Sequence, residues 1–216
     1  MNEIAVIGVS SRFSFSDNMQ QLHKQLLNAS SFENRMAMAG LRGKLLGIDG
    51  YEDVCGEVSY IKDIDKFDYK FFEISKKEAR NMSPEMRLSM ECSVQTILDA
   101  GYSIESFRGS NCGVIIAQSN SNYKGLLKDK DGISYVGNLR AMTTGNIAYY
   151  LDLQGPNMVI DTTCSSSLTA IHEAVNSLSN METDYMLVGG VELALLKSKE
   201  DINEVKSLGI FSKDGI

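Results

Sequence analysis

Cys164 is the residue of this sequence best placed to act as a nucleophile, in the run 161–168 (Asp-Thr-Thr-Cys-Ser-Ser-Ser-Leu). The apolar stretch before it predicts a short strand that ends at Asp161. The apolar residues after it recur at helical spacing, at Leu168, Ile171, Val175 and Leu178. Cys164 is therefore expected at a strand-to-helix corner, where free backbone N–H groups and the helix dipole favour the nucleophilic thiolate.

Context alone leaves a second interpretation of Cys164 open, because free cysteines are commonly buried core residues. A third interpretation, the nucleophile elbow of an α/β-hydrolase, requires glycine two positions before and two positions after the nucleophile. Thr162 and Ser166 occupy those positions. The hydrolase interpretation is therefore excluded.

The elements that must position this turn are predicted from apolar runs and capping signals. Four apolar runs have the length of strands, at 3–9, 111–117, 157–161 and 185–188, and the first two have the pattern of strands buried on both faces. Helical patterns separate most of them. Strands that alternate with helices indicate an α/β layer architecture with a mostly interior sheet.

Helix boundaries are most clearly marked at 84–100, with Pro84 at the first helical position and Gly101 after the last. Its predicted buried face consists of Met86, Met90, Val94, Ile97 and Leu98, with the methionines as core residues rather than metal ligands. Ser75 and Glu78 form a capping-box pattern, and Asp17 is the predicted cap of a helix whose apolar residues Met19, Leu22 and Leu26 fall on one face. The stretch 28–50 has no clear period and is expected to be a loop or lid.

Composition excludes several classes of protein. The chain has 216 residues and a net charge of −7, from 21 Lys and Arg against 28 Asp and Glu, with no basic block, which argues against a nucleic-acid partner. No run approaches the roughly 20 apolar residues of a membrane span, and no signal peptide is evident, so we expect a soluble cytoplasmic protein.

The four cysteines, Cys55, Cys92, Cys112 and Cys164, form no C-x-x-C pair and indicate reduced thiols without a metal site. No linker is visible, which favours one compact unit over residues 1–216.

The run 161–168 resembles the active-site motif of β-ketoacyl synthase (ketosynthase) domains of polyketide and fatty acid synthases, typically Asp-Thr-Ala-Cys-Ser-Ser-Ser-Leu. The similarity extends in the same order along nearly the whole chain, over 2–12, 79–91, 98–102, 147–156, 187–191 and 207–216. Single positions differ from the family pattern. Thr163 replaces the usual alanine, and Ser83 and Glu85 replace aspartate and glutamine beside Pro84.

The resemblance implies a thiolase-like fold, with layered α-β-α-β-α architecture, and a dimer whose interface lies near the nucleophile strand. It implies that Cys164 accepts an acyl chain from the phosphopantetheine thioester of an acyl carrier protein, before a decarboxylative Claisen condensation with a malonyl-type extender. The backbone N–H of Cys164 would be one of two oxyanion-hole donors. No dissociable cofactor and no metal are implied.

The histidines mark the main departure from the family, which completes its site with a lysine and with histidines in His-Gly-Thr-Gly-Thr and Asn-x-x-Gly-His motifs. Neither motif is present, and the chain has only His23 and His172. His172 lies eight residues after Cys164, on the order of 12 Å along a helix axis. That exceeds the roughly 3 Å reach of a general base. We therefore expect His172 to have a packing role and His23 to be an exposed helix residue.

Residues 207–216 resemble an element from about the middle of a ketosynthase. We therefore expect 1–216 to be the N-terminal portion of a ketosynthase domain, inactive in condensation without a complementary C-terminal half that supplies the histidines. Two alternatives stay open. One is a non-catalytic scaffold or carrier-protein docking module derived from such an enzyme, and the other is a thiol acyltransferase without condensation.

Overall fold

The computed structural model describes residues 3–14, 16–28, 61–127, 131–193, 195 and 207–209. The chain divides into two compact units, Met1–Ser10 with Ile64–Ala194 (unit 1) and Ser11–Asp63 with Leu195–Ile216 (unit 2). This division differs from the single compact unit that the lack of a linker favoured. Each unit combines segments from distant parts of the sequence, so no linker composition marks the boundary between them.

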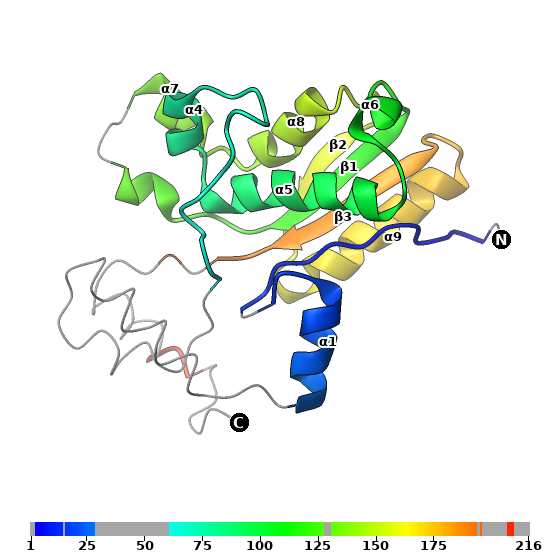
Figure 1. Ribbon diagram of the computed structural model, residues 1–216, viewed down its shortest axis with the longest axis horizontal. Helices are drawn as coiled ribbons and strands as arrows, with labels where there is room; N and C mark the ends of the chain where they lie inside the picture. The colour runs from blue at the N-terminus through cyan, green and yellow to red at the C-terminus, as the bar shows by residue number, and fades with distance from the viewer. Residues whose placement is uncertain are drawn as a thin grey trace. The chain divides into compact units, whose positions relative to one another are not determined.

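Unit 1 contains a parallel sheet of three strands in the order β2-β1-β3 (Figure 1). Strand β1 (Cys112–Gln118) pairs with β2 (Asn157–Ile160) and with β3 (Tyr185–Val191). In this register Val114 lies opposite Asn157 on one side and Leu187 on the other. The strands predicted at 111–117, 157–161 and 185–188 are confirmed, with small shifts at their ends.

Helices cover both faces of this sheet. Strand β1 is buried along its whole length, and its alternate residues point to opposite faces. Cys112, Val114 and Ile116 join the larger apolar cluster, which includes residues of α5 (Pro84–Asp99) and α8 (Ala141–Tyr150). Ile115 and Ala117 pack against Ala170 and Ala174 of α9 (Ser166–Ser179) on the other face. The layers confirm the predicted α/β class.

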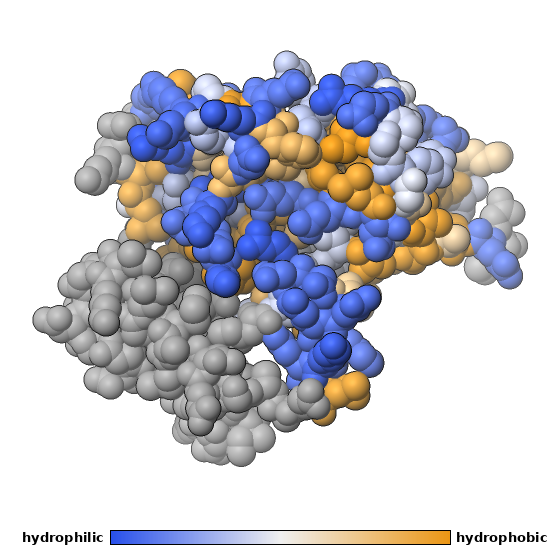
Figure 2. All heavy atoms as spheres, in the orientation of Figure 1, coloured by the Kyte–Doolittle hydropathy of each residue, from blue (hydrophilic) through white to orange (hydrophobic). Residues whose placement is uncertain are grey.

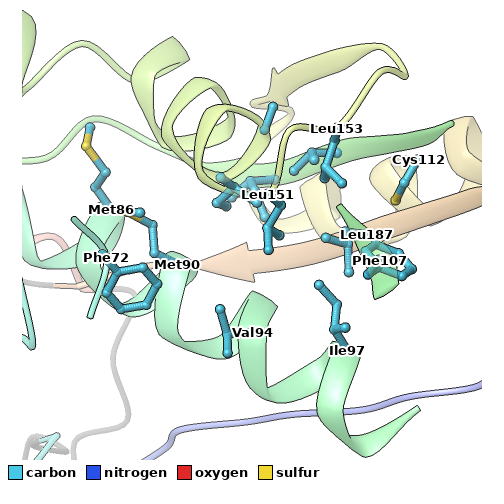
Figure 3. Packing of buried hydrophobic residues seen from close by; sticks show 14 of the residues in the cluster. Phe72, Met86, Met90, Val94, Ile97, Phe107, Cys112, Leu151, Leu153 and Leu187 are labelled. Atoms are coloured by element: carbon cyan, nitrogen blue, oxygen red, sulfur yellow. The ribbon is translucent and has the colours of Figure 1, made fainter. Parts of the chain in front are cut away.

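Helix α5 supplies one side of the larger core (Figure 3). It begins where the sequence predicts, because the Ser83 hydroxyl accepts a hydrogen bond from the backbone N–H of Met86 at 3.3 Å and Pro84 follows. It ends before Gly101, which has φ +85°. Four predicted core residues are buried, Met86, Met90, Val94 and Ile97, but Leu98 is 53% exposed and its prediction is wrong. Leu98 follows Ile97 directly and therefore points to a different side of the helix.

The remaining described helices are short. They are α1 (Met19–Asn28), α4 (Lys76–Asn81), α6 (Ile104–Phe107), α7 (Gly132–Val136), and the 3₁₀ turns η1 (Tyr123–Leu126) and η2 (Thr163–Ser165). The Ser75 half of the predicted capping box is confirmed, because the Ser75 hydroxyl accepts a hydrogen bond from the N–H of Glu78 at 3.1 Å. The predicted cap of α1 is wrong by one residue. Asn18 accepts from Gln21 N–H at 2.9 Å, and Asp17 instead donates its N–H to the Gln21 side chain at 2.8 Å.

The predicted strand at 3–9 is not a strand in the structure. The segment runs along α5, where Val9 N–H donates to Asp99 at 2.8 Å and a Cβ on Gly8 would lie 2.3 Å from the carbonyl oxygen of Thr96. Val6 is 83% exposed, and Figure 2 shows apolar surface beside this end of the chain. The prediction is wrong here because these contacts are made with a helix instead of a neighbouring strand.

Three expectations fall outside the described residues. They concern the loop or lid at 28–50, apart from Asn28 at the end of α1, the state of Cys55, and the terminal element 207–216 beyond Gly209. In the part of the chain that is described, no helix has both the length and the apolar character needed to cross a membrane.

Candidate active site

Cys164 lies at the predicted strand-to-helix corner. Strand β2 ends at Ile160, η2 carries Cys164, and α9 begins at Ser166. The thiol is exposed, so the interpretation of Cys164 as a buried core residue is wrong. Cys112 is the buried thiol of unit 1, and burial raises its pKa to about 12. Of these two cysteines, Cys164 is the one open to a substrate.

Serine side chains hold the backbone of this turn. The buried Ser166 hydroxyl accepts a hydrogen bond from Thr162 N–H at 2.8 Å and donates one to the Thr163 carbonyl at 2.7 Å. Ser165 donates to the carbonyl of Thr162, also at 2.8 Å. These bonds join side chains that follow Cys164 to backbone groups of the two residues that precede it, which fixes the path of the chain through the turn.

Thr163, directly before Cys164, has a left-handed backbone conformation with φ +56°. This region costs an L-residue about 1–2 kcal/mol and is unusual for a β-branched one. The N–H of Thr163 donates to Asp161 Oδ1 at 3.2 Å, which stabilises the strained residue. Strain of this kind clusters at functional sites.

Arg140, at the N-terminus of α8, binds the same aspartate from the other side. Its Nη1 lies 2.7 Å from Asp161 Oδ2 and 3.5 Å from the carbonyl oxygen of Gln118, the last residue of β1. No signal in the sequence marks Arg140, which lies 21 residues before Asp161 and belongs to no motif. The packing of α8 against β1 and β2 brings the two together.

A second polar group lies at the same edge of the sheet as Asp161. It consists of Ser119 and Ser121, which follow β1, Glu192, which follows β3, and Glu85 in the first turn of α5. Glu85 is only 2% exposed and accepts a hydrogen bond from Ser121 at 2.9 Å. Burial raises the pKa of Glu85, and the nearby charge of Glu192 adds to this effect. Glu192 in turn accepts a hydrogen bond from Ser119. In the sequence, Glu85 is notable only because it replaces the glutamine that is typical of ketosynthases at this position.

His172 does not lie where it could serve as the missing base. His172 is exposed on α9, and its Nε2 lies 3.2 Å from Nδ2 of Asn176, one turn further from Cys164. The expected packing role of His172 is therefore wrong, since its ring is not covered by the core of unit 1. His23 is exposed on α1, as predicted.

Comparisons with known proteins agree with this fold and identify the family. Residues 1–215 match the family model "Beta-ketoacyl synthase, N-terminal domain". The chain is 37% identical over 190 residues to polyketide synthase PksM of Bacillus subtilis, covering 88% of this chain and 4% of PksM. It is 35% identical over 219 residues to the fatty acid synthase of Anser anser anser, covering all of this chain and 60% of that protein.

A solved ketosynthase structure supports the same family. The ketosynthase from module 6 of the bacillaene synthase of Bacillus subtilis superposes with a TM-score of 0.74 at 30% identity, over 97% of this chain. This chain covers 34% of that ketosynthase. The fold is therefore that of the N-terminal half of the thiolase-like ketosynthase architecture. From its sequence and its fold, the chain belongs to the β-ketoacyl synthase N-terminal domain family of polyketide and fatty acid synthases.

Proposed function

We propose that residues 1–216 are the N-terminal portion of a ketosynthase domain and that Cys164 is its nucleophile. The observation that carries this proposal is the exposed thiol at the strand-to-helix corner, on a turn whose backbone is held by Ser166 and Asp161. Fixed geometry of this kind is what a nucleophile beside an oxyanion donor requires.

In the proposed reaction, the Cys164 thiolate attacks the carbonyl carbon of an acyl thioester on the phosphopantetheine of an acyl carrier protein. The oxyanion that forms accepts a hydrogen bond from the Cys164 N–H. The C–S bond to phosphopantetheine then breaks, the pantetheine thiol leaves, and the acyl group remains on Cys164 as a new thioester. A malonyl-type extender then loses CO₂, and its carbanion attacks this thioester and releases the Cys164 thiol.

The second half-reaction needs a general base, groups that promote decarboxylation, and a second oxyanion donor. Since His172 contacts Asn176 and the sequence contains neither histidine motif of the family, we assign the base, the decarboxylation histidines and the second oxyanion donor to a complementary C-terminal part of the ketosynthase. The 34% coverage of the solved ketosynthase supports such a part. A cytoplasmic location, where thiols remain reduced, belongs to the same proposal.

An exposed apolar face supports contact with that part. Leu168, Ile171 and Val175, whose spacing indicated this helix, are all exposed, and Leu168 is 74% exposed. The buried side of α9 is instead formed by small residues, among them Ala170 and Ala174. A row of large apolar side chains beside the nucleophile is typical of a surface that another polypeptide segment covers. Strand β2 is an edge strand of the described sheet, which supports dimerisation nearby.

The acylation test uses this chain mixed with a polypeptide that carries the C-terminal ketosynthase part with its His-Gly-Thr-Gly-Thr motif. The mixture is incubated with hexanoyl-pantetheine, and the acyl group is located by intact-mass and peptide mass spectrometry. We expect acylation at Cys164 that is lost in Cys164→Ala and kept in the control Cys92→Ala. Equal acylation of the Cys164→Ala variant would exclude Cys164 as the nucleophile.

The partner test is native mass spectrometry of the same mixture. We expect a complex that Ile171→Asp weakens by at least about tenfold, because a charge on a buried interface face is costly. The matched control is Ile133→Asp on α7, since Ile133 is also exposed but lies on another helix. A complex that binds acyl carrier protein but is never acylated would favour the scaffold or docking alternative.

A further inference from the structure

Arg140 connects three chain segments at the edge of the sheet where Cys164 lies. It occupies the position before α8, and its guanidinium contacts Asp161 Oδ2 at 2.7 Å and the Gln118 carbonyl at 3.5 Å. Gln118 ends β1, and Asp161 directly follows β2. The carboxylate of Asp161 is thereby tied to the end of the central strand.

The other oxygen of the same carboxylate acts on the nucleophile turn. Asp161 Oδ1 accepts the N–H of Thr163, the residue with φ +56°. If the Asp161 carboxylate rotated, Thr163 would lose this bond, and a β-branched residue without it relaxes toward ordinary backbone regions. Such a change would turn the peptide between Thr163 and Cys164, and with it the N–H of Cys164.

The exposure of the ion pair argues against a role confined to folding. The side chains of Arg140 and Asp161 are 38% and 32% exposed. Ion pairs with this degree of exposure contribute little to the stability of a fold. What the Arg140–Asp161 pair does supply is the orientation of a carboxylate that contacts the residue next to Cys164.

We propose that Arg140 is a positioning residue for acyl transfer at Cys164. By orienting Asp161, it holds Thr163 in the left-handed conformation and fixes the direction of the Cys164 N–H that stabilises the oxyanion. The inference rests on the proposed function, because it assigns a role to Arg140 only in the reaction of Cys164 with a thioester.

The test compares Arg140→Gln, Arg140→Lys and Asp161→Asn in the complex used for acylation. Misdirecting one oxyanion donor should lower the acylation rate of Arg140→Gln by about tenfold or more. Arg140→Lys, which keeps the charge, should recover part of that rate. Because both residues act through one contact, the double variant Arg140→Gln/Asp161→Asn should be no slower than the slower single variant.

Two further readouts separate positioning from folding. Alkylation of Cys164 by iodoacetamide forms no oxyanion, so its rate should stay within about twofold of the wild-type rate in Arg140→Gln. Exchange of the Thr163 amide hydrogen, measured by NMR on the full chain, should become faster. The matched control is Lys77→Gln, which removes the Lys77–Asp131 ion pair at 2.8 Å on a different surface and should change none of these rates.

The outcomes distinguish the two proposals. If the wild-type complex is acylated at Cys164 and Arg140→Gln is acylated equally fast, the positioning role is wrong and the proposed function stands. If Arg140→Gln lowers acylation and alkylation of Cys164 equally, the variant has disturbed the turn or fold as a whole, and the positioning role is also overturned. If the wild-type complex is never acylated, both proposals fail. Should Arg140→Gln not fold, Asp161→Asn provides the same comparison.

Discussion

The hydroxyl of Ser166 accepts a hydrogen bond from the backbone N–H of Thr162 at 2.8 Å, across the turn that carries Cys164. The same hydroxyl donates to the Thr163 carbonyl at 2.7 Å, so one buried side chain joins both residues that precede the thiol. The first helical residue of α9 thus holds the end of the loop after β2. The turn depends on this serine more than on the exposed serines beside it.

Ser166→Ala should therefore lower the free energy of unfolding by about 1–3 kcal/mol, since it leaves backbone groups of the turn without their partner. Acylation of Cys164 should slow in the same variant. Urea denaturation and the acylation assay measure the two effects. Ser165→Ala is the control, because the Ser165 side chain is exposed and water can replace its bond to Thr162. Equal effects of both substitutions would contradict the role assigned to Ser166.

Thr163→Asn should raise the free energy of unfolding by about 1 kcal/mol, because asparagine adopts the left-handed region more readily than a β-branched residue. The backbone bonds of residue 163 to Asp161 and Ser166 would remain. Thermal and urea denaturation test this expectation. Thr163→Val is the matched control, since valine is also β-branched and relieves no strain. An Asn variant no more stable than the Val variant would show that φ +56° carries no cost at this position.

Glu85→Gln should stabilise the chain at neutral pH. Burial raises the folded-state pKa of Glu85 above its ordinary value of 4.5, so the folded state binds its proton more tightly than the unfolded state. Stability then falls as pH rises from the unfolded pKa through the folded pKa, and the loss persists above it. Glutamine removes this loss and can still accept the bond from Ser121.

Unfolding free energies of wild type and Glu85→Gln, measured by urea titration between pH 4 and 8, test this sign. The advantage of the glutamine variant should be largest at pH 7 to 8 and should shrink toward pH 4. Glu78→Gln on the exposed face of α4 serves as the control and should show little difference across the range. An advantage that grows toward acid pH would contradict the raised pKa.

The features that the sequence predicted correctly are local ones. Helix α5 is bounded by Ser83, Pro84 and Gly101, which act on neighbouring backbone groups, so its limits are visible without the fold. The corner at Cys164 follows from a strand pattern beside a helix pattern for the same reason. The Arg140–Asp161 pair could not be predicted, since those residues meet only where α8 packs against the sheet.

The buried face of α9 could not be predicted from the sequence for a related reason. Periodicity shows that Leu168, Ile171 and Val175 share a side of the helix, but not which side meets this sheet. The sheet packs against Ala170 and Ala174, because small residues let the helix approach β1 closely. Likewise, the apolar run 3–9 has the composition of a strand, and only tertiary contacts with Thr96 and Asp99 place it beside α5.

Gly155→Ala should strongly destabilise the sheet of unit 1. A Cβ at Gly155 would lie 2.5 Å from the carbonyl carbon of Cys112 and from the N atom of Gly113, and both are backbone atoms at the start of β1. Because a backbone cannot rotate away as a side chain can, the strand must shift, which costs about 1–3 kcal/mol or more. The Gly155 N–H also donates to the Cys112 carbonyl at 3.0 Å, a bond that the shift would weaken.

Urea denaturation of Gly155→Ala should show this loss, and circular dichroism should show whether the sheet is retained. Gly132→Ala is the matched control. A Cβ at Gly132 meets no atom within 4 Å, and the residue begins helix α7, where alanine is preferred over glycine. The control should therefore be neutral or stabilising by up to about 1 kcal/mol. Equal stability of the two variants would mean that the loop before β2 does not approach β1 as closely as the structure places it.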